Sequence, residues 1–183
     1  IKNAIADFSG VSAAYFGYQD RYRATPGDDN LATRWGVAAV PPGSGNGDRT
    51  MTGVYSSTTD THESRMWWDH LRRSGFIAGA GYAQPQNAFN GIIGVQTGDG
   101  PAAGGSAPVA VLGGFTGLIM CSTNLPDKVA IALDVQMDDG NPSGGAVRAV
   151  LGAGSVVISA GLAATSGGYL ETGTNVYILC RQF

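Results

Sequence analysis

The first 22 residues carry one stripe of apolar side chains, and this stripe constrains the fold more than any other part of the sequence. Its members recur at spacings of three and four residues, which is the repeat of one face of an α-helix. They are Ile1, Ile5, Phe8, Val11, Tyr15, Tyr18 and Tyr22. The stripe predicts a long helix over residues 1–24, ended by Pro26, because the residue before a proline avoids helical geometry. We expect the last five members to form the face that packs on the core, with the three tyrosines beneath a sheet.

Two glycines lie inside the same predicted helix. Gly10 and Gly17 are seven residues apart, so they share a face. Each costs a helix interior about 1 kcal/mol, so tertiary packing must hold this helix, and both positions predict close packing. Glycine is abundant throughout, at 29 of 183 positions, roughly twice the ordinary share of ~7 %. Charged residues make up only 14 % of the chain, against about 25 % in an average protein, which predicts a neutral surface with many turns.

Residues 25–106 have the composition of a long loop region with one short helix. Proline, glycine, asparagine and aspartate, the turn-forming residues, are frequent in it. A helical pattern returns over residues 58–74, with Glu63 in the first turn and an apolar side that Trp67 and Trp68 should anchor.

Residues 107–183 change to the pattern of short strands. Apolar runs alternate with turn residues, which is typical of antiparallel sheets. The runs span residues 109–112, 115–121, 128–137, 146–151, 155–160 and 175–181, and a further short strand is expected at 92–95. Strict alternation over 128–137 predicts a half-buried strand that faces the long helix. The chain is therefore expected to be one α+β domain, residues 1–183, in which a long N-terminal helix packs on an antiparallel sheet and a loop region with a short helix is inserted between them.

Charge and motifs argue against several functions. The net charge is −3 and the isoelectric point about 5.1, so there is no broad cationic field for a phosphate backbone. The two histidines, His62 and His70, do not form a zinc pair, because the residue four positions after His62 is Met66. We expect no nucleic-acid partner and no enzymatic activity, and no cofactor apart from the calcium considered next.

Acidic residues are most concentrated near residue 138. Asp134, Asp138 and Asp139 offer several carboxylate oxygens, the ligands that Ca²⁺ prefers. A simpler interpretation is that Asp139 and Gly140 only form a hairpin turn after the strand at 128–137, because Asp-Gly is a strong turn signal. The sequence leaves both interpretations open.

The two cysteines, Cys121 and Cys180, lie far apart and in no Cys-x-x-Cys pair, which argues against a zinc site. A disulfide is the preferred interpretation. It would close a loop of about 60 residues, contribute roughly 4 kcal/mol in the chain-entropy model and indicate an oxidising compartment. Two buried free thiols are the alternative.

Three segments, in the same order, resemble bacterial type IV pilin-like proteins with a cleaved prepilin leader. Residues 22–29 read YRATPGDD and are similar to the Tyr-x-Ala-x-Pro-Gly-Asp turn of that family. Residues 67–77 read WWDHLRRSGFI and resemble its Trp-x-His-Leu segment. Residues 133–145 read LDVQMDDGNPSGG and resemble its Asp-x-Lys-x-Asp-Asp-Gly-x-Pro-x-x-Gly stretch.

The resemblance implies the headgroup of a pilin or pseudopilin, with a helix packed on an antiparallel sheet. It implies a hydrophobic segment before Ile1, methylated at the mature N-terminus, which anchors the subunit in the inner membrane facing the periplasm and later forms the filament core. The uncapped start of the predicted helix agrees with this expectation. Cys121 and Cys180 would form the C-terminal disulfide found in many pilins. The expected partners are identical or related subunits, and the expected location is the bacterial cell surface.

The leading hypothesis is therefore a structural subunit of a type IV pilus or related filament, which acts by polymerisation and surface presentation. A type II secretion pseudopilin, which forms a short periplasmic filament, is one alternative. A binding module for cell adhesion is another, with residues 41–48 or 80–106 as its adhesive surface.

Overall fold

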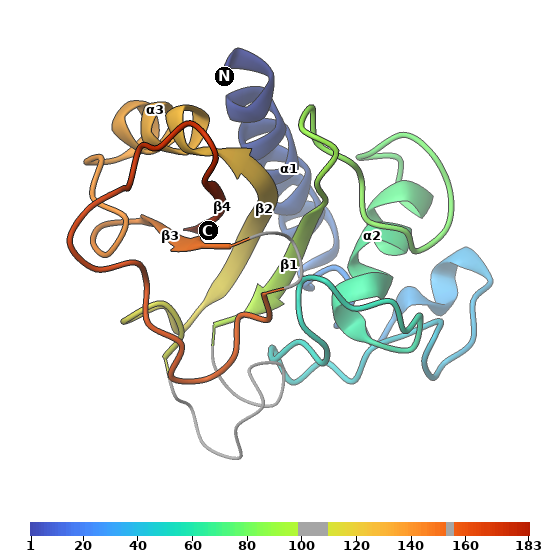
Figure 1. Cartoon of the computed structure of the whole chain (residues 1–183). Helices are drawn as coiled ribbons and strands as arrows, with labels where there is room; N and C mark the ends of the chain where they lie inside the picture. The colour runs from blue at the N-terminus through green and yellow to red at the C-terminus, as the bar shows by residue number, and fades with distance from the viewer. Residues whose placement is uncertain (99–109, 153–155) are drawn as a thin grey trace.

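A computed structural model describes residues 1–98, 110–152 and 156–183 (Figure 1). In chain order the elements are α1 (Lys2–Tyr22), the 3-10 helix η1 (Ala32–Trp35), α2 (Glu63–Arg73), β1 (Ile93–Thr97), β2 (Leu118–Pro126), α3 (Asp127–Met137), β3 (Val147–Leu151) and β4 (Val176–Gln182). The four strands form an antiparallel sheet in the order β1-β2-β4-β3. The expected α+β class, with an N-terminal helix and an antiparallel sheet, is confirmed.

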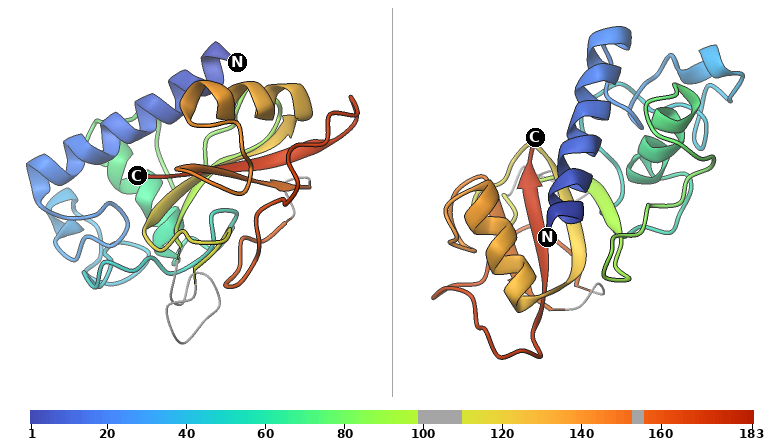
Figure 2. Two further views of the ribbon diagram at one scale, coloured as in Figure 1. Left: turned by 90° about the vertical axis from the view of Figure 1, so that its left-hand side faces the viewer. Right: turned by 90° about the horizontal axis from the view of Figure 1, so that it is seen from above.

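The sheet is covered on both faces. Helices α1 and α3 contact each other on one face, and Figure 2 shows both lying along it. The core on this face joins Phe8 and Val11 of α1 to Met120 of β2 and Leu179 of β4. Loops cover the opposite face, where a second core packs around Tyr55. Because both faces are covered, every residue of β1 and six of the nine residues of β2 are buried.

Helix α1 is the predicted long helix, and it ends at Tyr22 because Arg23 takes a left-handed conformation, with φ 55°. Of the five side chains predicted to face the core, four are buried: Phe8, Val11, Tyr15 and Tyr18. Tyr22 is half-buried.

The two tyrosines nearest the C-terminal end of α1 have aromatic partners in the loop region. The rings of Tyr18 and Tyr22 both contact Trp35, and Tyr18 also contacts Phe76. These partners lie outside the sheet, so the C-terminal part of α1 packs on the loop region. The Tyr15 ring contacts Phe183, the residue that directly follows β4.

The two glycines of α1 differ in their surroundings. A Cβ on Gly17 would lie 2.6 Å from the Phe76 ring, so the close packing predicted there is confirmed. A Cβ on Gly10 would have no atom within 4 Å. The prediction of close packing at Gly10 is therefore wrong.

The predicted strand at 128–137 is wrong, because these residues form helix α3. The alternation of apolar residues is real, and its members are Val129, Ile131, Leu133, Val135 and Met137. Burial follows a different set. Asp127, Ala130, Leu133 and Asp134 are the buried residues of α3, and their spacing of three and four is helical. Val135, a member of the alternating set, is 60 % exposed.

The other predicted elements are found with shifted bounds. Helix α2 lies within the predicted 58–74, and β1, β3 and β4 overlap the runs at 92–95, 146–151 and 175–181. Strand β2 begins inside the run at 115–121 and continues to Pro126. Val109 and Ser155 lie outside the described residues. Residues 110–112 contribute only an isolated bridge, and 156–160 form no strand.

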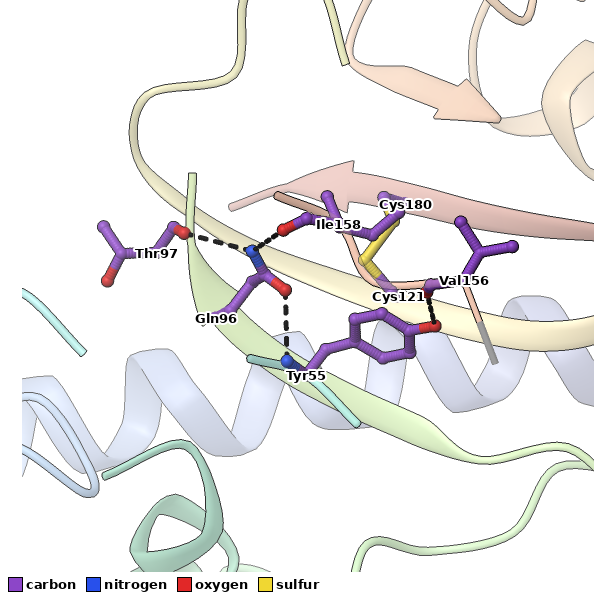
Figure 3. Close-up of a disulfide and its surroundings, with 7 residues drawn as sticks. All are labelled: Tyr55, Gln96, Thr97, Cys121, Val156, Ile158 and Cys180. Atoms are coloured by element: carbon purple, nitrogen blue, oxygen red, sulfur yellow. Dashed lines mark hydrogen bonds between the residues drawn. A yellow bond between two sulfur atoms is a disulfide. The ribbon is translucent and has the colours of Figure 1, made fainter. Parts of the chain in front are cut away.

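The predicted disulfide is present and links the two central strands. Cys121 of β2 lies directly opposite Cys180 of β4. Figure 3 shows it on the face opposite α1, beside Gln96 of β1. The Gln96 amide accepts the Tyr55 N–H (3.1 Å) and donates to the Ile158 carbonyl (2.9 Å). A covalent bond and a buried amide therefore hold two loops against the sheet.

Removing the disulfide should destabilise the protein. The bond joins residues 59 apart in sequence, and a loop of this length contributes roughly 4 kcal/mol in the chain-entropy model. We expect the double variant Cys121→Ala/Cys180→Ala to lose about 2–5 kcal/mol of unfolding free energy in urea titration. Reduced wild type should show the same loss. A variant within about 1 kcal/mol of the oxidised wild type would contradict this expectation.

Candidate functional site

Two of the three segments that carry the resemblance meet at His70 of α2. The Gly27 N–H donates to His70 Nδ1 (2.9 Å), and His70 Nε2 lies 2.8 Å from the Gly43 carbonyl oxygen. Because Nδ1 accepts, Nε2 must carry the proton and donate to Gly43. The ring is fully buried, and burial lowers the pKa of His70. The neutral imidazole therefore connects α2 to two loops.

The turn after α1 fits tightly against α2. A Cβ on Gly27 would overlap the Glu63 carbonyl oxygen and lie 2.9 Å from the Trp67 backbone nitrogen. Gly27 also has a φ of 81°, which favours glycine. Only glycine satisfies both conditions at this position.

The buried Asp28 carboxylate holds the loop at 47–49. It accepts backbone N–H groups from Gly47 (2.6 Å), Asp48 (3.2 Å) and Arg49 (2.6 Å). Burial raises the pKa of Asp28, while these hydrogen bonds act in the opposite direction. The loop at 47–49 thus presents three N–H donors to one carboxylate.

Asp29 connects α1 to the loop that follows it. Its carboxylate accepts the Tyr18 hydroxyl (2.6 Å) and the Leu31 N–H (2.8 Å), and it pairs with the Arg34 guanidinium at 2.7 Å. The Asp29 side chain has no exposed area. Such a charge is stable only when it is fully paired.

The Glu63 carboxylate, at the start of α2, accepts backbone N–H groups from two loop residues. Its Oε1 accepts the Asn46 N–H (3.2 Å) and its Oε2 the Thr52 N–H (2.8 Å). The Thr52 hydroxyl accepts the Glu63 N–H in return (3.0 Å). This is a capping-box exchange made across a loop.

The acidic cluster predicted from the sequence comes together in space. Ligand atoms of Asp134, Asp138 and Asp139 all lie within 4.8 Å of one another. Among the described residues this group could hold a cation, since carboxylates are the ligands of hard metals. The alternative hairpin is wrong in one respect: Gly140, with φ 77°, turns the chain after a helix and not after a strand.

These carboxylates are already hydrogen-bonded to the protein. Asp138 Oδ2 accepts the N–H groups of Ala146 (2.5 Å) and Val147 (2.9 Å). Asp134, fully buried, accepts the Tyr169 hydroxyl at 2.6 Å and the Gly140 N–H at 3.1 Å. Burial raises the pKa of Asp134. These hydrogen bonds connect the cluster at the end of α3 to β3 and to the C-terminal loop.

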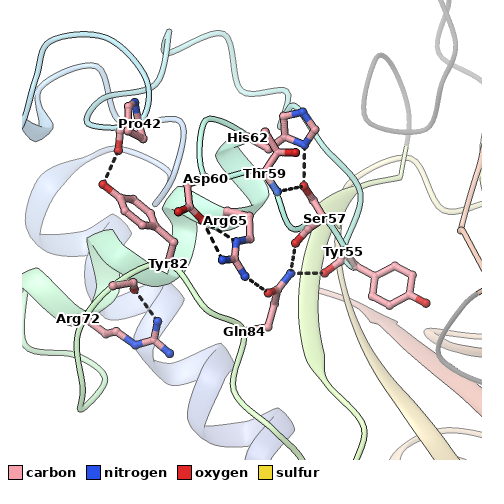
Figure 4. Close-up of polar contacts among 11 residues, drawn as sticks. Pro42, Tyr55, Ser57, Thr59, Asp60, His62, Arg65, Arg72, Tyr82 and Gln84 are labelled. Carbon is pink, nitrogen blue, oxygen red and sulfur yellow. Dashed lines mark hydrogen bonds and ion pairs between the residues drawn. The ribbon is translucent and has the colours of Figure 1, made fainter.

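The described part of the alternative adhesive surface is tied to the protein body (Figure 4). The Gln84 amide donates to the carbonyl oxygens of Tyr55 (3.1 Å) and Ser57 (2.7 Å) and accepts from Arg65 of α2. The Tyr82 hydroxyl donates to the Pro42 carbonyl oxygen at 2.9 Å. Residues 99–106 of the proposed adhesive segment lie outside the described residues.

Ser57 and His62 form a close pair that resembles the start of a catalytic dyad. Their Oγ and Nδ1 atoms are 2.7 Å apart, and Ser57 Oγ also accepts the Thr59 N–H at 3.1 Å. The Ser57 hydroxyl thus contacts both the His62 ring and the Thr59 backbone, and the pair orders the chain before α2.

The sequence motifs located this site, but they did not indicate its partners. The Pro-Gly-Asp turn predicted a sharp turn, and Asp28 and Glu63 were not identified as residues that hold loops. The partners lie far away in sequence, 43 residues for Gly27 and His70. The sequence did contain one signal for these contacts, because Asp28 and Glu63 are carboxylates that lie in or beside segments rich in turn-forming residues.

Among the described residues, no helix has the length and apolar character that crossing a membrane requires. Comparisons with protein-family models, with curated proteins and with solved structures found no match to this chain.

The His70 contacts predict a pH dependence. Because burial lowers the folded-state pKa below the ordinary value of 6.5, the unfolded chain takes up the proton first as the pH falls. The contribution of neutral His70 to the free energy of unfolding is complete above pH 6.5. It is lost on acidification, by up to about 1.4 kcal/mol per pH unit. We expect urea titrations between pH 7 and 5 to show this slope in wild type and in His62→Gln, and a reduced slope in His70→Gln. Equal slopes in all three would contradict the assignment.

Asp138 should stabilise the fold without a metal. We expect Asp138→Ala to lose about 1–3 kcal/mol of unfolding free energy in EDTA, because two N–H groups lose their acceptor. Asp139→Ala is the matched control, since Asp139 accepts the Asn141 N–H in an exposed turn, and it should stay within about 0.5 kcal/mol of wild type. If the Asp138→Ala loss occurs only with calcium present, these carboxylates act as metal ligands instead.

Proposed function

We propose that this chain is the head domain of a structural, non-enzymatic subunit of a type IV pilus or a related extracellular filament. The observation that carries the proposal is the contact between two of the segments that resemble pilin-like proteins. The turn at 22–29 meets the helix at 67–77 through the Gly27 to His70 hydrogen bond, and Gly27 fits directly against α2. The residues that carry the resemblance thus depend on one another.

The third segment supports the proposal in the same way. Its Asp138 carboxylate binds the backbone at Ala146, and a Cβ on Gly145 would overlap that carboxylate. The spacing of Asp and Gly in this segment therefore has a geometric cause, which is closure of the α3–β3 loop. A chance likeness of sequence letters would not require this closure.

The shape of α1 also suits a filament subunit. The proposal requires a hydrophobic segment upstream of Ile1 that continues this helix. Ile1 is 46 % exposed, and the N-terminal end of α1 lies at the outside of the molecule (Figure 1). An upstream segment can therefore extend the helix away from the sheet.

The surface is suited to contacts between copies. Phe16 on the outer side of α1 is 53 % exposed and Val135 on α3 is 60 % exposed. The low charge content lets like subunits approach closely with little repulsion. Apolar residues on two neighbouring helices would be covered by adjacent subunits.

The direct test uses the chain with its native upstream sequence. We expect a pilus-assembling host that expresses it to release the protein in the sheared surface fraction, as filaments visible by electron microscopy. Wild-type protein that is produced and folded but never recovered in sheared filaments would refute the proposal.

A substitution on α1 tests the role of the exposed apolar side chain. Burying a phenylalanine contributes about 1.5–3 kcal/mol, so Phe16→Asp should reduce the sheared yield about tenfold or more. Phe16→Leu should retain most of it. Both variants must keep the wild-type circular dichroism spectrum as isolated head domains. Equal filament yields for Phe16→Asp and wild type would exclude this surface as a subunit contact.

A further inference from the structure

A cavity of about 600 Å³ opens between the C-terminal half of α1 and the loops that follow it. One wall is formed by α1, where Tyr15 and Gln19 lie four residues apart on one face, and by Arg23, which directly follows the helix. Asn30 and Arg49 line the cavity from the loops. Its volume lies within the range of about 300–1,000 Å³ that is usual for small-molecule sites.

Two arginines give the cavity a positive charge. The Arg23 guanidinium has only a weak pairing with Asp20, at 3.9 Å between side chains that are both more than 80 % exposed. For Arg49, no carboxylate among the described residues lies within ion-pair distance. Both guanidinium groups are therefore available to a ligand.

The one carboxylate of the lining does not cancel this charge. Asp28 also lines the cavity, but its oxygens accept the N–H groups of Gly47, Asp48 and Arg49. Two arginines and one such aspartate leave a net charge of +1. A planar guanidinium matches a carboxylate in two parallel hydrogen bonds, so the cavity suits an anionic ligand.

The remaining lining suits a ring that carries hydroxyl groups. Asn30 and Thr25 supply an amide and a hydroxyl. The Gln19 amide donates to the Tyr15 hydroxyl at 2.7 Å, which leaves its carbonyl oxygen as an acceptor. Met51 and Leu118 add apolar surface. These polar groups match the hydroxyls of a sugar, and the small apolar area matches the C–H groups of its ring.

We propose that this cavity binds a sugar that bears a carboxylate group, such as a uronic or a nonulosonic acid. The carboxylate pairs with Arg23 and Arg49, while Gln19 and Asn30 bind the hydroxyls. The inference does not depend on filament assembly, because every residue of the site belongs to one chain.

The test compares two sugars that differ only in the carboxylate. We expect isothermal titration calorimetry to show saturable binding of methyl β-glucuronide or of N-acetylneuraminic acid, with a Kd on the order of 1 mM. Methyl β-glucoside should bind about tenfold more weakly than the glucuronide, because it lacks a charge-assisted contact. Absence of saturable binding by both acidic sugars would overturn the proposal. Inorganic phosphate that binds as tightly as the acidic sugars would overturn the assignment to a sugar.

Variants locate the binding. Arg23→Gln and Arg49→Gln should each weaken the binding of the acidic sugar about five- to tenfold. Arg21→Gln is the matched control, since Arg21 is an exposed arginine on the same helix that does not line the cavity, and it should bind as wild type does. Melting curves verify that each variant is folded. Unchanged binding in both cavity variants would place the ligand elsewhere and overturn the proposal.

Discussion

Carboxylates that accept backbone N–H groups are the interaction on which the rest of this structure depends. Much of the chain between α1 and β1 has no regular secondary structure, so its N–H groups need other acceptors. Asp28 and Glu63 supply them there, and Asp138 does so between α3 and β3. Asp127 does the same in the C-terminal loop, where it accepts the Gly173 N–H at 2.7 Å. A protein in which only 14 % of the residues are charged thus uses several of its carboxylates to fix loops.

The same arrangement explains why the elements could be predicted more reliably than their contacts. The stripe of α1 and the apolar side of α2 are periodic and local, so the sequence was sufficient for both. At α3, branched residues alternate by chance, and Val135 belongs to the alternating set although it is exposed. What selects the helix there is the burial of Ala130 and Leu133 against the sheet, which depends on residues far away in sequence.

The candidate site could be predicted only in part, for a similar reason. The motifs indicated turns at Pro26 to Asp29 and at Asp139-Gly140, and both are turns. A hydrogen bond such as that from Gly27 to His70 depends on how α2 lies against the turn. No local pattern encodes that placement. The acidic cluster was visible in the sequence because its three members are close neighbours. Tyr169, whose hydroxyl donates to Asp134, lies 35 residues away and could not be identified as a partner.

The disulfide has a mechanical consequence that follows from its position in the chain. Cys180 lies on β4, and Cys121 lies on the neighbouring strand β2. Tension applied between the two chain ends is transmitted through the sulfur atoms and bypasses the covalent ring between them. Helix α3, strand β3 and the acidic loop belong to that ring. Under such tension only the chain outside the ring, before Cys121 and after Cys180, can be extended, so the residues inside the ring would keep their length even if the sheet came apart.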